Sequence, residues 1–484
     1  MRLTEKGLLK NIDWMLVLCW FVLFLIGWMN IYASIHSSEP SSIFSPDGRS
    51  GKQFLWMLIS LGFVVVILFV LNPHIYESLS LPIYLGVALL LVAVIFLGTE
   101  VKGSRSWFEF GPVRFQPAEV SKISTSLLLS TVMSQFGFKI SRLKDFLTAA
   151  AIIIFPMLVI VGQSETGSAL VYVGFAFVLY REGMSGWILF LGFMAILLFV
   201  LTLAASPYTA LMVLACVTSF CDAAYTGKIK GWLVKYLPVL VFLGFVPLIM
   251  ENIWEAAGGD LEKMVKPTYI FLGVILLTLP FVIFRAYRNR SGFTVLAAIS
   301  LLAGIMLVYS TDFLFNDVLQ DHQRKRIEVL LGMKDDPSGV GYNVNQSMIA
   351  IGSGGLFGKG YLQGTQTTYG FVPEQSTDFI FCTIGEEWGF IGSAAVILLF
   401  VFLIWRIISK AERCKEAFTR IYGYCVASCI FMHLFINIGM TIGLMPVIGI
   451  PLPFISYGGS SLLAFTIMLF IFIALESNEK KFAS

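Results

Sequence analysis

The chain has 484 residues, of which 57% are hydrophobic and 13% are charged. A water-soluble fold cannot bury that much apolar surface, so the composition indicates a protein that crosses a membrane many times. A net charge of +3, dispersed along the chain, gives no basis for nucleic-acid binding, and the four histidines show no metal-ligand spacing.

About fourteen apolar segments come near the roughly 17–25 residues that a membrane-spanning helix needs. We therefore predict an all-α polytopic membrane protein. The predicted spans cover residues 13–35, 53–71, 83–98, 118–136, 147–162, 167–181, 186–204, 208–225, 233–250, 268–284, 293–312, 387–408, 420–444 and 459–476.

The start of the chain is basic, and no small-residue cleavage site follows the first apolar run, which favours a retained span over a removed signal peptide. Lysines and arginines gather in alternate connections, as cytoplasmic loops require, whereas residues 251–267 are acidic. This alternation predicts that both termini are cytoplasmic. It also places residues 313–386, the largest polar connection, on the outer side.

The segment KGSRSWFEFGPVRFQPAEVSK, residues 102–122, leads into the fourth predicted span. Glu119 and Lys122 lie three residues apart, so they share one helix face just inside the membrane. They form either a structural ion pair or the charged wall of a cavity. Arg105 and Arg114 suit diphosphate oxygens through bidentate hydrogen bonds. Trp107, which lies between these arginines, is explained by an interfacial aromatic belt as well as by a substrate contact.

Two further polar segments carry weaker signals. The turn QSETG at residues 163–167 contains Glu165, a candidate substrate-binding residue, although a helix cap explains the turn as well. The basic run 323–326 faces either anionic headgroups or solvent. The glycine-rich segment 352–360 lacks the GK[ST] of a P-loop, which argues against a nucleotide site.

Asp378 lies in TQTTYGFVPEQSTDFIFCTIGEEWGF, residues 365–390, beside aromatic and apolar residues. A carboxylate at the edge of the membrane is costly, so it requires a partner or a function. We interpret Asp378 as a catalytic base.

The segment GLMPVIGIPLPFISYGGSS at residues 443–461 contains three prolines, which break a helix, and a glycine pair that permits close backbone approach. Irregular backbone at this depth is tolerated where it is buried in protein or lines a polar cavity. A cavity wall is therefore preferred over a plain connection between helices. Ser456, Gly458 and Gly459 are candidate substrate-binding residues.

Four of these segments resemble motifs of the SEDS family (shape, elongation, division, sporulation): RFQPAEVSK, GYNVNQSMIAIGSGGLFGKG, STDFIF with EEWGF, and PLPFISYGGSS. They occur in the order that the family shows, and the resemblance covers roughly residues 10–185 and 315–478. GYLQGTQ, FVPEQSTDF and GIPLPFISYGG are more similar to the RodA (elongation) branch than to the FtsW (division) branch.

The resemblance implies an integral-membrane peptidoglycan glycosyltransferase that polymerises lipid II at the outer face of the cytoplasmic membrane during cell elongation. It implies a class B penicillin-binding protein as partner, together with other membrane proteins of the elongation complex. It identifies Asp378 with the family's essential acid. Trp107, Glu119 and Lys122 match further family positions.

The chain departs from the family in two places. The family's Gln-Pro-Asp-x-Gly-Thr turn reads Gln-Ser-Glu-Thr-Gly-Ser here, so Glu165 stands where the family has Asp. The family fold has ten spans, whereas about fourteen are predicted here, which indicates about four inserted spans. The predicted domains are core spans at 1–204, inserted hairpins at 205–312, the catalytic outer loop at 313–386, and core spans with a cytoplasmic tail at 387–484.

The mechanism expected from these assignments has Asp378 take the proton of the acceptor sugar hydroxyl as general base. The leaving diphosphate requires positive charge from Arg105, Arg114, Lys122 or a bound Mg²⁺ or Mn²⁺, and Asp378 could itself be a metal ligand. A lipid II flippase is the alternative function, because intramembrane charges and broken helices also suit a transporter. A scaffold that recruits a penicillin-binding protein is a third possibility, but it would not need an isolated acid.

Overall fold

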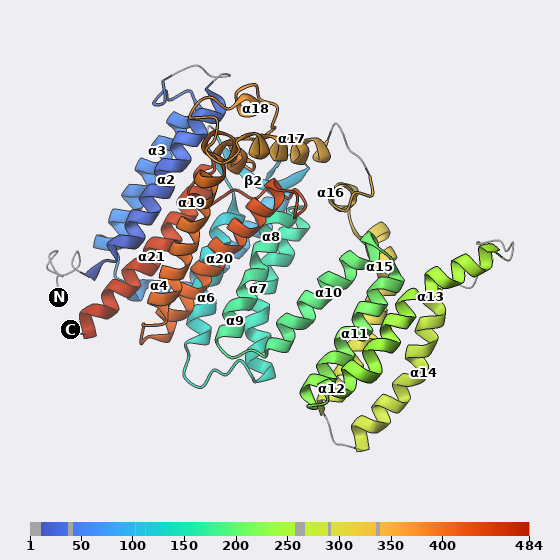
Figure 1. The fold of residues 1–484 in the computed structure, drawn as a ribbon. Helices are drawn as coiled ribbons and strands as arrows, with labels where there is room; N and C mark the ends of the chain where they lie inside the picture. Colours follow the sequence, from blue (N-terminus) through green and yellow to red (C-terminus); the bar gives the residue numbers. More distant parts are fainter. Residues whose placement is uncertain are drawn as a thin grey trace. The chain divides into compact units, whose positions relative to one another are not determined.

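A computed structural model of the protein describes residues 11–36, 42–101, 103–111, 113–256, 267–288, 292–334 and 339–483. Figure 1 shows the chain as a ribbon. The chain forms two compact units. The first comprises residues 1–185 and 336–484, and the second comprises residues 186–335.

The first unit is built mainly of long helices. Its N-terminal part contains α2 (Trp14–Ile35), α3 (Arg49–Val65) with the π-helix η1 (Val66–Val70), α4 (His74–Ser78), α5 (Ser80–Leu97), α6 (Pro117–Met133), α7 (Leu143–Gly162), α8 (Thr166–Val171), the 3₁₀-helix η2 (Tyr172–Gly174) and α9 (Phe175–Arg181). Its C-terminal part contains α17 (Val340–Ser353), α18 (Thr365–Thr368), α19 (Ile380–Ala411), α20 (Ala417–Thr441) and α21 (Gly459–Ala483).

Helix α6 is the buried centre of this unit, and it packs against α5, α7, α20 and α21. It is rich in serine, a residue that is poor at filling an apolar core. The hydroxyls of Ser126 and Ser130 donate to carbonyls one turn earlier in the same helix, at 2.7 and 2.6 Å. These internal hydrogen bonds satisfy the polar groups and allow the helix to be buried.

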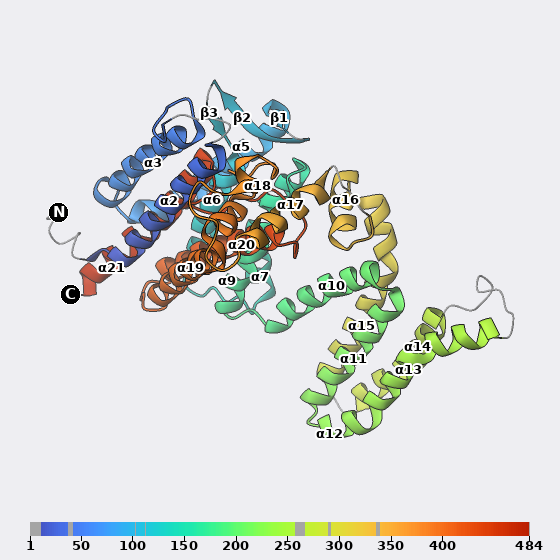
Figure 2. The ribbon, with the colours of Figure 1, turned by 45° about the horizontal axis from the view of Figure 1, so that its top comes forward.

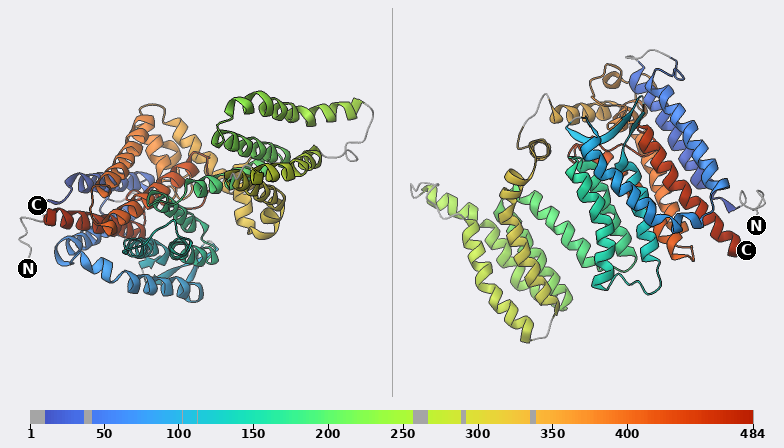
Figure 3. Two further views of the ribbon diagram at one scale, coloured as in Figure 1. Left: turned by 90° about the horizontal axis from the view of Figure 1, so that it is seen from below. Right: turned by 180° about the vertical axis from the view of Figure 1, so that it is seen from behind.

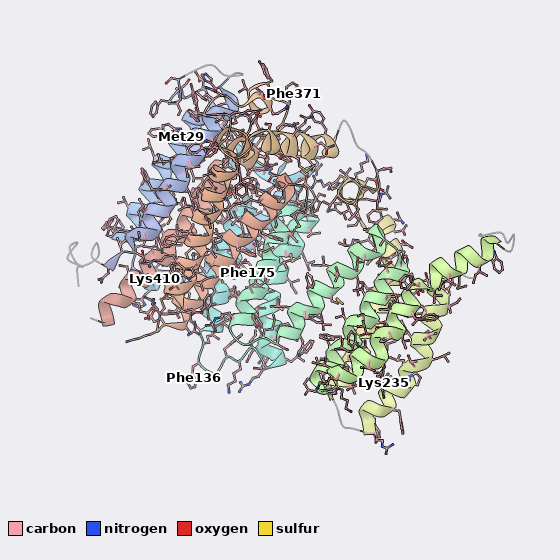
Figure 4. The ribbon with its side chains drawn as sticks, in the orientation of Figure 1. Met29, Phe136, Phe175, Lys235, Phe371 and Lys410 are labelled. Atoms are coloured by element: carbon pink, nitrogen blue, oxygen red, sulfur yellow. The ribbon has the colours of Figure 1, made fainter. Side chains whose placement is uncertain are left out.

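Segments that are far apart in sequence lie side by side in the first unit. Helix α21 packs along α3, and α2 packs against α19, so the two ends of the chain share one bundle (Figure 3). Asp13, just before α2, contacts Lys410 near the end of α19 at 2.9 Å. At the opposite end of the bundle, Tyr361 donates to the carbonyl of Met29 at 3.1 Å. Figure 4 labels Lys410 and Met29 at these two ends.

The second unit is also helical. It contains α10 (Gly186–Ala204), α11 (Pro207–Tyr225), α12 (Ile229–Gly231), the π-helix η3 (Trp232–Tyr236), α13 (Leu237–Ala256), α14 (Pro267–Arg288), α15 (Gly292–Phe313), the π-helix η5 (Leu314–Val318) and α16 (Asp321–Leu330). Helix α11 packs against α10, α14 and α15. Leu211, Leu214, Phe271 and Val308 form part of its apolar core.

The class predicted from the sequence, an all-α polytopic membrane protein, is confirmed. Among the described residues, ten helices are long and apolar enough to cross a membrane. Helix α6 occupies the fourth predicted span, and α8 to α9 form a shorter apolar run at the sixth. The total of about fourteen spans stays a prediction, as does the division into domains. The second unit contains the whole predicted insertion, 205–312, and extends beyond it on both sides.

Residues 313–386, the predicted outer connection, contain η5, α16, α17 and α18. The structure differs from the prediction at the start of the span that follows. The span predicted to begin at residue 387 begins at Ile380, with a break at Gly389, where φ is 66° and ψ is −163°. Glu386 and Glu387 made this stretch look like a loop, yet both are buried. Two backbone N–H groups donate to the Glu386 carboxylate at 2.9 Å, and Lys359 pairs with it at 2.7 Å, which makes burial possible.

A small sheet also forms where the sequence predicts a polar loop. Strands β1 (Thr99–Val101), β2 (Ser104–Phe110) and β3 (Val113–Phe115) pair antiparallel in the order β1-β2-β3. Strand β2 contacts α5 and α6, as Figure 2 shows for α5. The sheet therefore presents Arg105, Trp107 and Arg114 from strands rather than from a loop.

Candidate functional site

Asp378 lies in the turn that immediately precedes α19, and its side chain is half-buried. Its backbone carbonyl accepts a hydrogen bond from Nδ2 of Asn437 on α20 at 2.8 Å. Its carboxyl group faces Gly449, because Oδ2 lies 3.2 Å from the position that a Cβ would occupy there. Gly449 also has a φ of +73°, which L-residues rarely adopt, so both its backbone and the nearby carboxylate favour glycine.

The turn that carries Asp378 is held by hydrogen bonds from α3 and from the segment 443–461, in addition to the bond from Asn437 on α20. Arg49, in the first turn of α3, donates to Oγ of Ser376 at 2.6 Å. The N–H of Tyr457 donates to the carbonyl of Ser376 at 2.8 Å. The hydroxyl of Ser456 donates to the carbonyl of Thr377 at 2.6 Å. The carboxyl group of Asp378 is therefore placed by contacts to the two residues before it as well as by Asn437.

Ser456, Gly458 and Gly459, the three candidates from the proline-rich segment, make internal contacts. The Ser456 hydroxyl accepts from the N–H of Leu452 at 2.8 Å in addition to the bond it donates, so its hydrogen-bonding capacity serves the loop. Gly458 donates to Gln53 at 3.3 Å. A Cβ at Gly459 would lie 2.1 Å from the ring of Trp56, so α3 and α21 can approach because this residue is glycine. These contacts support a structural role for the three residues.

Glu119 and Lys122 form an ion pair inside the bundle. Their charged atoms lie 2.9 Å apart, and their side chains are 3% and 2% exposed. The ammonium group also lies 2.9 Å from Nε2 of His433 and 4.9 Å from the ring centre of Phe465. Removal of one partner from such a buried pair typically costs about 3–5 kcal/mol, because the other charge is left unpaired.

His433 and Asn437 are residues of this site that the sequence analysis missed. Both lie on α20, one turn apart, and both are buried. Nδ1 of His433 lies 2.9 Å from the carbonyl of Pro451. A single histidine within an apolar span is a signal that could have identified the first of them, since intramembrane ionisable residues usually have a function.

Glu165 lies in the turn between α7 and α8, close to the N-terminus of α6. It accepts hydrogen bonds from Gln116, the residue before α6, and from Ser168 at 2.7 Å. Its other carboxylate oxygen is buried without a partner among the residues that the structure describes. Burial raises the pKa of Glu165 to about 7, and the negative charge of Glu119 adds to this shift, against the hydrogen bond from Ser168. The structure thus places Glu165 in the electrostatic neighbourhood of Glu119 and Lys122.

The two arginines of the sheet are partnered at the surface. Arg105 pairs with Glu100 at 3.3 Å, and Arg114 pairs with Glu109 at 2.9 Å. Both arginine side chains are about 60% exposed, at 59% and 61%. Exposed pairs of this kind are weak, typically within about 1 kcal/mol, so either arginine can exchange its partner for a ligand.

Trp107 is half-buried on β2 between these pairs, and its carbonyl accepts from Thr99 at 3.2 Å. The sheet is joined to α21 because Ser460 donates to the carbonyl of Arg114 at 2.9 Å. The N–H of Arg105 donates to the carbonyl of Gln163 at 3.3 Å, which ties the sheet to the turn of Glu165. Hydrogen bonds therefore connect four segments that the sequence singled out, at one end of the bundle: residues 102–122, 163–167, 365–390 and 443–461.

The described residues contain no group of three or more His, Cys, Asp or Glu side chains that could hold a metal ion. Asp378 would thus be a single carboxylate ligand. Mg²⁺ is commonly bound in this way, by one or two carboxylates together with substrate phosphates and water. The donor set fits an ion that arrives with a diphosphate and does not fit a metal held by the protein alone.

A family model described as cell cycle protein (FtsW, RodA, SpoVE) matches residues 13–235 and 264–481. The match leaves out residues 236–263 within the predicted insertion of 205–312. Peptidoglycan glycosyltransferase MrdB of Escherichia coli K12 is 28% identical over 424 residues, which cover 87% of this chain and 84% of the relative. Peptidoglycan glycosyltransferase RodA of Treponema pallidum is 28% identical over 477 residues, which cover 98% of each.

Two solved structures share the fold. A structure described as the structural coordination of polymerization and crosslinking by a peptidoglycan synthase complex matches with a TM-score of 0.59 and 20% identity, over 97% of this chain and 98% of the other. The crystal structure of the rod shape determining protein RodA of Thermus thermophilus matches with a TM-score of 0.54 and 20% identity, over 97% of both chains.

Proposed function

The chain belongs to the family of cell cycle proteins that includes FtsW, RodA and SpoVE, and from this premise we propose that it polymerises lipid II as a peptidoglycan glycosyltransferase of the RodA type. The structural observation that carries the proposal is the placement of Asp378. Its half-buried carboxyl group faces Gly449 from a turn that Arg49, Ser456 and Asn437 hold in place.

In the proposed reaction, Asp378 accepts the proton of the 4-hydroxyl group on the acceptor sugar. The oxygen of that hydroxyl forms a bond to the anomeric carbon of the donor sugar, and the bond from that carbon to the polyprenyl diphosphate breaks. The diphosphate leaves with its electron pair and gains negative charge, which nearby cations stabilise. The lipid chains of both substrates remain in the bilayer.

Arg49, which the sequence did not single out, is a candidate for the cation on the diphosphate. Its guanidinium group bonds the hydroxyl of Ser376, two residues before the acid. Arg105 and Arg114 support it from the sheet, where both are exposed. Lys122 is less suited, because its ammonium group is buried against Glu119 and His433. Lys122 is better placed to support the residues of the site than to contact the diphosphate.

A divalent cation, Mg²⁺ or Mn²⁺, stays part of the proposal. Asp378 would be its protein ligand, and the substrate diphosphate would supply further oxygens. When bound, such an ion neutralises charge on the diphosphate.

We place the reaction at the outer face of the bacterial cytoplasmic membrane, with both termini in the cytoplasm, because basic residues concentrate on the connections that this arrangement puts inside. The role is in cell elongation. A class B penicillin-binding protein is the proposed partner, together with other elongation-complex membrane proteins. The description of the matching structure, which couples polymerization to crosslinking in one complex, supports such a pairing.

Lipid II transport, the alternative function, has less support. A transporter needs a polar path that reaches both faces of the membrane. The connected candidate residues of this chain lie at one end of the bundle. Charged residues at the other end, such as Asp13 with Arg406 and Lys410, are engaged in ion pairs.

The test is glycan-strand formation from lipid II by the purified protein in detergent or liposomes, with and without the partner and a divalent cation. We expect Asp378→Asn to lower the rate by at least about 100-fold, because a general base typically contributes a factor of 10²–10⁴. The matched control is Glu374→Gln, which makes the same acid-to-amide change four residues earlier, at an exposed side chain. Polymerisation by Asp378→Asn at the wild-type rate would refute the assignment.

A further inference from the structure

Two neighbouring side chains of α20 lie between the Glu119–Lys122 ion pair and the turn of Asp378. Asn437 donates from Nδ2 to the carbonyl of Asp378 at 2.8 Å and to the carbonyl of Ile450 at 2.7 Å. His433, one turn earlier, contacts Nζ of Lys122 and the carbonyl of Pro451, both at 2.9 Å. Each side chain therefore makes one contact with a functional candidate and one with the segment 450–451.

The contacts of His433 define its protonation state. The carbonyl of Pro451 can only accept, so Nδ1 must carry a proton and donate it. The ammonium group of Lys122 can only donate, so Nε2 must offer its lone pair. His433 is thus a neutral imidazole whose two nitrogen atoms are both occupied. His433 is 1% exposed, so neither nitrogen faces bulk solvent.

Asn437 acts as a clamp of a similar kind. The two hydrogen atoms of its amide nitrogen are both used, and both acceptors are backbone carbonyls. One belongs to Asp378, and the other belongs to the residue after Gly449, which faces the Asp378 carboxyl group. The amide therefore fixes the backbone of the acid and the backbone opposite its carboxyl group relative to each other.

We propose that His433 and Asn437 are positioning residues for the transferase reaction. They fix the position of the segment 449–451 relative to the Glu119–Lys122 ion pair. Through this segment they also fix the position of the Asp378 carboxyl group. This inference rests on the proposed function. Errors of about 1 Å in the position of a reacting group can cost about 100-fold in rate, so the loss of one such contact has a large effect on turnover even though neither residue touches substrate.

Two substitutions of His433 separate its two contacts. In His433→Asn, the amide nitrogen takes the place of Nδ1 and keeps the donor to Pro451, while the contact with Lys122 is lost. In His433→Gln, the longer side chain places its amide oxygen near the position of Nε2 and keeps the acceptor for Lys122, while the contact with Pro451 is lost. A third variant, Asn437→Leu, keeps nearly the same size and branching of the side chain, introduces no charge and removes both donors.

The control is Thr441→Val, on the same helix one turn after Asn437. The Thr441 hydroxyl donates to the carbonyl of Ile438 in its own helix at 2.8 Å, so its loss leaves the segment 449–451 untouched. All four variants and the wild type are compared for kcat and KM with lipid II, and for Tm in the same detergent.

We expect all three test variants to lose about 10- to 100-fold in kcat, with KM within about twofold of wild type and a Tm close to that of the control. A merely structural role would lower Tm or the yield of folded protein and leave the kcat of the folded molecules unchanged. Three outcomes would overturn the inference. They are a lower Tm with an unchanged kcat, variants that cannot be purified in folded form, and a wild-type kcat in both His433 variants. If the wild-type protein fails to polymerise lipid II, the proposed function itself falls, which distinguishes the two failures.

Discussion

The two ends of the first unit are held together by different kinds of interaction. At the end where the chain termini meet, ion pairs dominate: Asp13 bonds Arg406 and Lys410, each at 2.9 Å, and Arg420 pairs with Glu182 at 2.9 Å. At the end that carries Asp378, Arg49 donates to Ser376 and Lys359 pairs with Glu386, but several other bonds run from neutral side chains to backbone carbonyls. Examples are Asn437 to Asp378, Gln53 to Ser456, Ser456 to Thr377 and Gln375 to Thr367.

The difference has a chemical consequence. Two charges that form an ion pair are not free to bind a substrate. A hydrogen bond from an amide or hydroxyl group to a carbonyl also fixes the backbone, but it leaves nearby charges free to do so. The Asp378 end can therefore be rigid and still offer charged groups to a substrate. The opposite end is stabilised by ion pairs.

Among the tests of this contrast, we expect the largest effect at Lys122, which forms a buried ion pair with Glu119. Lys122→Met leaves Glu119 as an unpaired buried charge and removes the donor to His433. We expect at least about a 100-fold loss of glycan synthesis and a destabilisation of about 3–5 kcal/mol. The measurements are the rate of polymerisation and thermal unfolding in detergent.

The double variant Glu119→Gln with Lys122→Met separates stability from function. Without a buried charge it should recover most of the lost stability, because neutral replacements of buried ion pairs are often tolerated. We expect its activity to stay low. Recovery of activity together with stability would show that the pair has only a structural role.

Most of the charged candidates were noticed in the sequence because charge is conspicuous in an apolar chain, but Arg49 was not. The sequence could not show which residues hold these charged groups. Lys122 and His433 are 311 residues apart, and Arg49 and Ser376 are 327 apart. Such contacts depend on how the helices pack, and no local pattern encodes them. Neutral clamps such as Asn437 are harder still to find, because one amide in an apolar helix is common.

The missed sheet and the misplaced helix start have local explanations. The stretch SRSWFEF contains three aromatic residues, which favour strands, and glycines with positive φ precede and follow it at Gly103 and Gly111. A search for long apolar segments does not detect so short a pattern. The start of α19 was misplaced because hydropathy treats Glu386 as solvent-exposed, whereas the fold supplies it with a full set of donors.

A smaller effect, on stability alone, is expected at the opposite end. Burial acts to raise the pKa of Asp13, but the hydrogen bonds and charges of Lys410 and Arg406 outweigh it and hold the pKa below its usual value. The group therefore adds stability above the unfolded-state pKa of about 3.9, and this contribution is lost as the pH falls through the lower folded pKa. We expect Asp13→Asn to lower Tm at pH 7 and to leave kcat unchanged.

The control for Asp13 is Asp145→Asn, which makes the same change at a partly exposed residue whose carboxylate accepts from the N–H of Lys139 at 3.1 Å. It should change Tm much less, since exposed polar contacts contribute little. A loss of kcat in Asp13→Asn without a loss of Tm would contradict the division of the unit into a stabilised end and a reactive end.

The smallest effect is expected at Glu165, and its sign is opposite to that at Asp13. Its pKa of about 7 exceeds the unfolded value of about 4.3, so the folded protein binds more protons than the unfolded chain between these two pH values. The free energy of unfolding therefore falls as the pH rises through this range and stays lower above it. Glu165→Gln removes this loss. We expect the variant to melt above the wild type at pH 8 and at nearly the same temperature at pH 4.5. Glu374→Gln, at an exposed side chain, should show no such dependence on pH. An equal difference in Tm at both pH values would contradict this prediction. The gain would then come from the amide contact with Gln116, and not from the removal of a buried negative charge at Glu165.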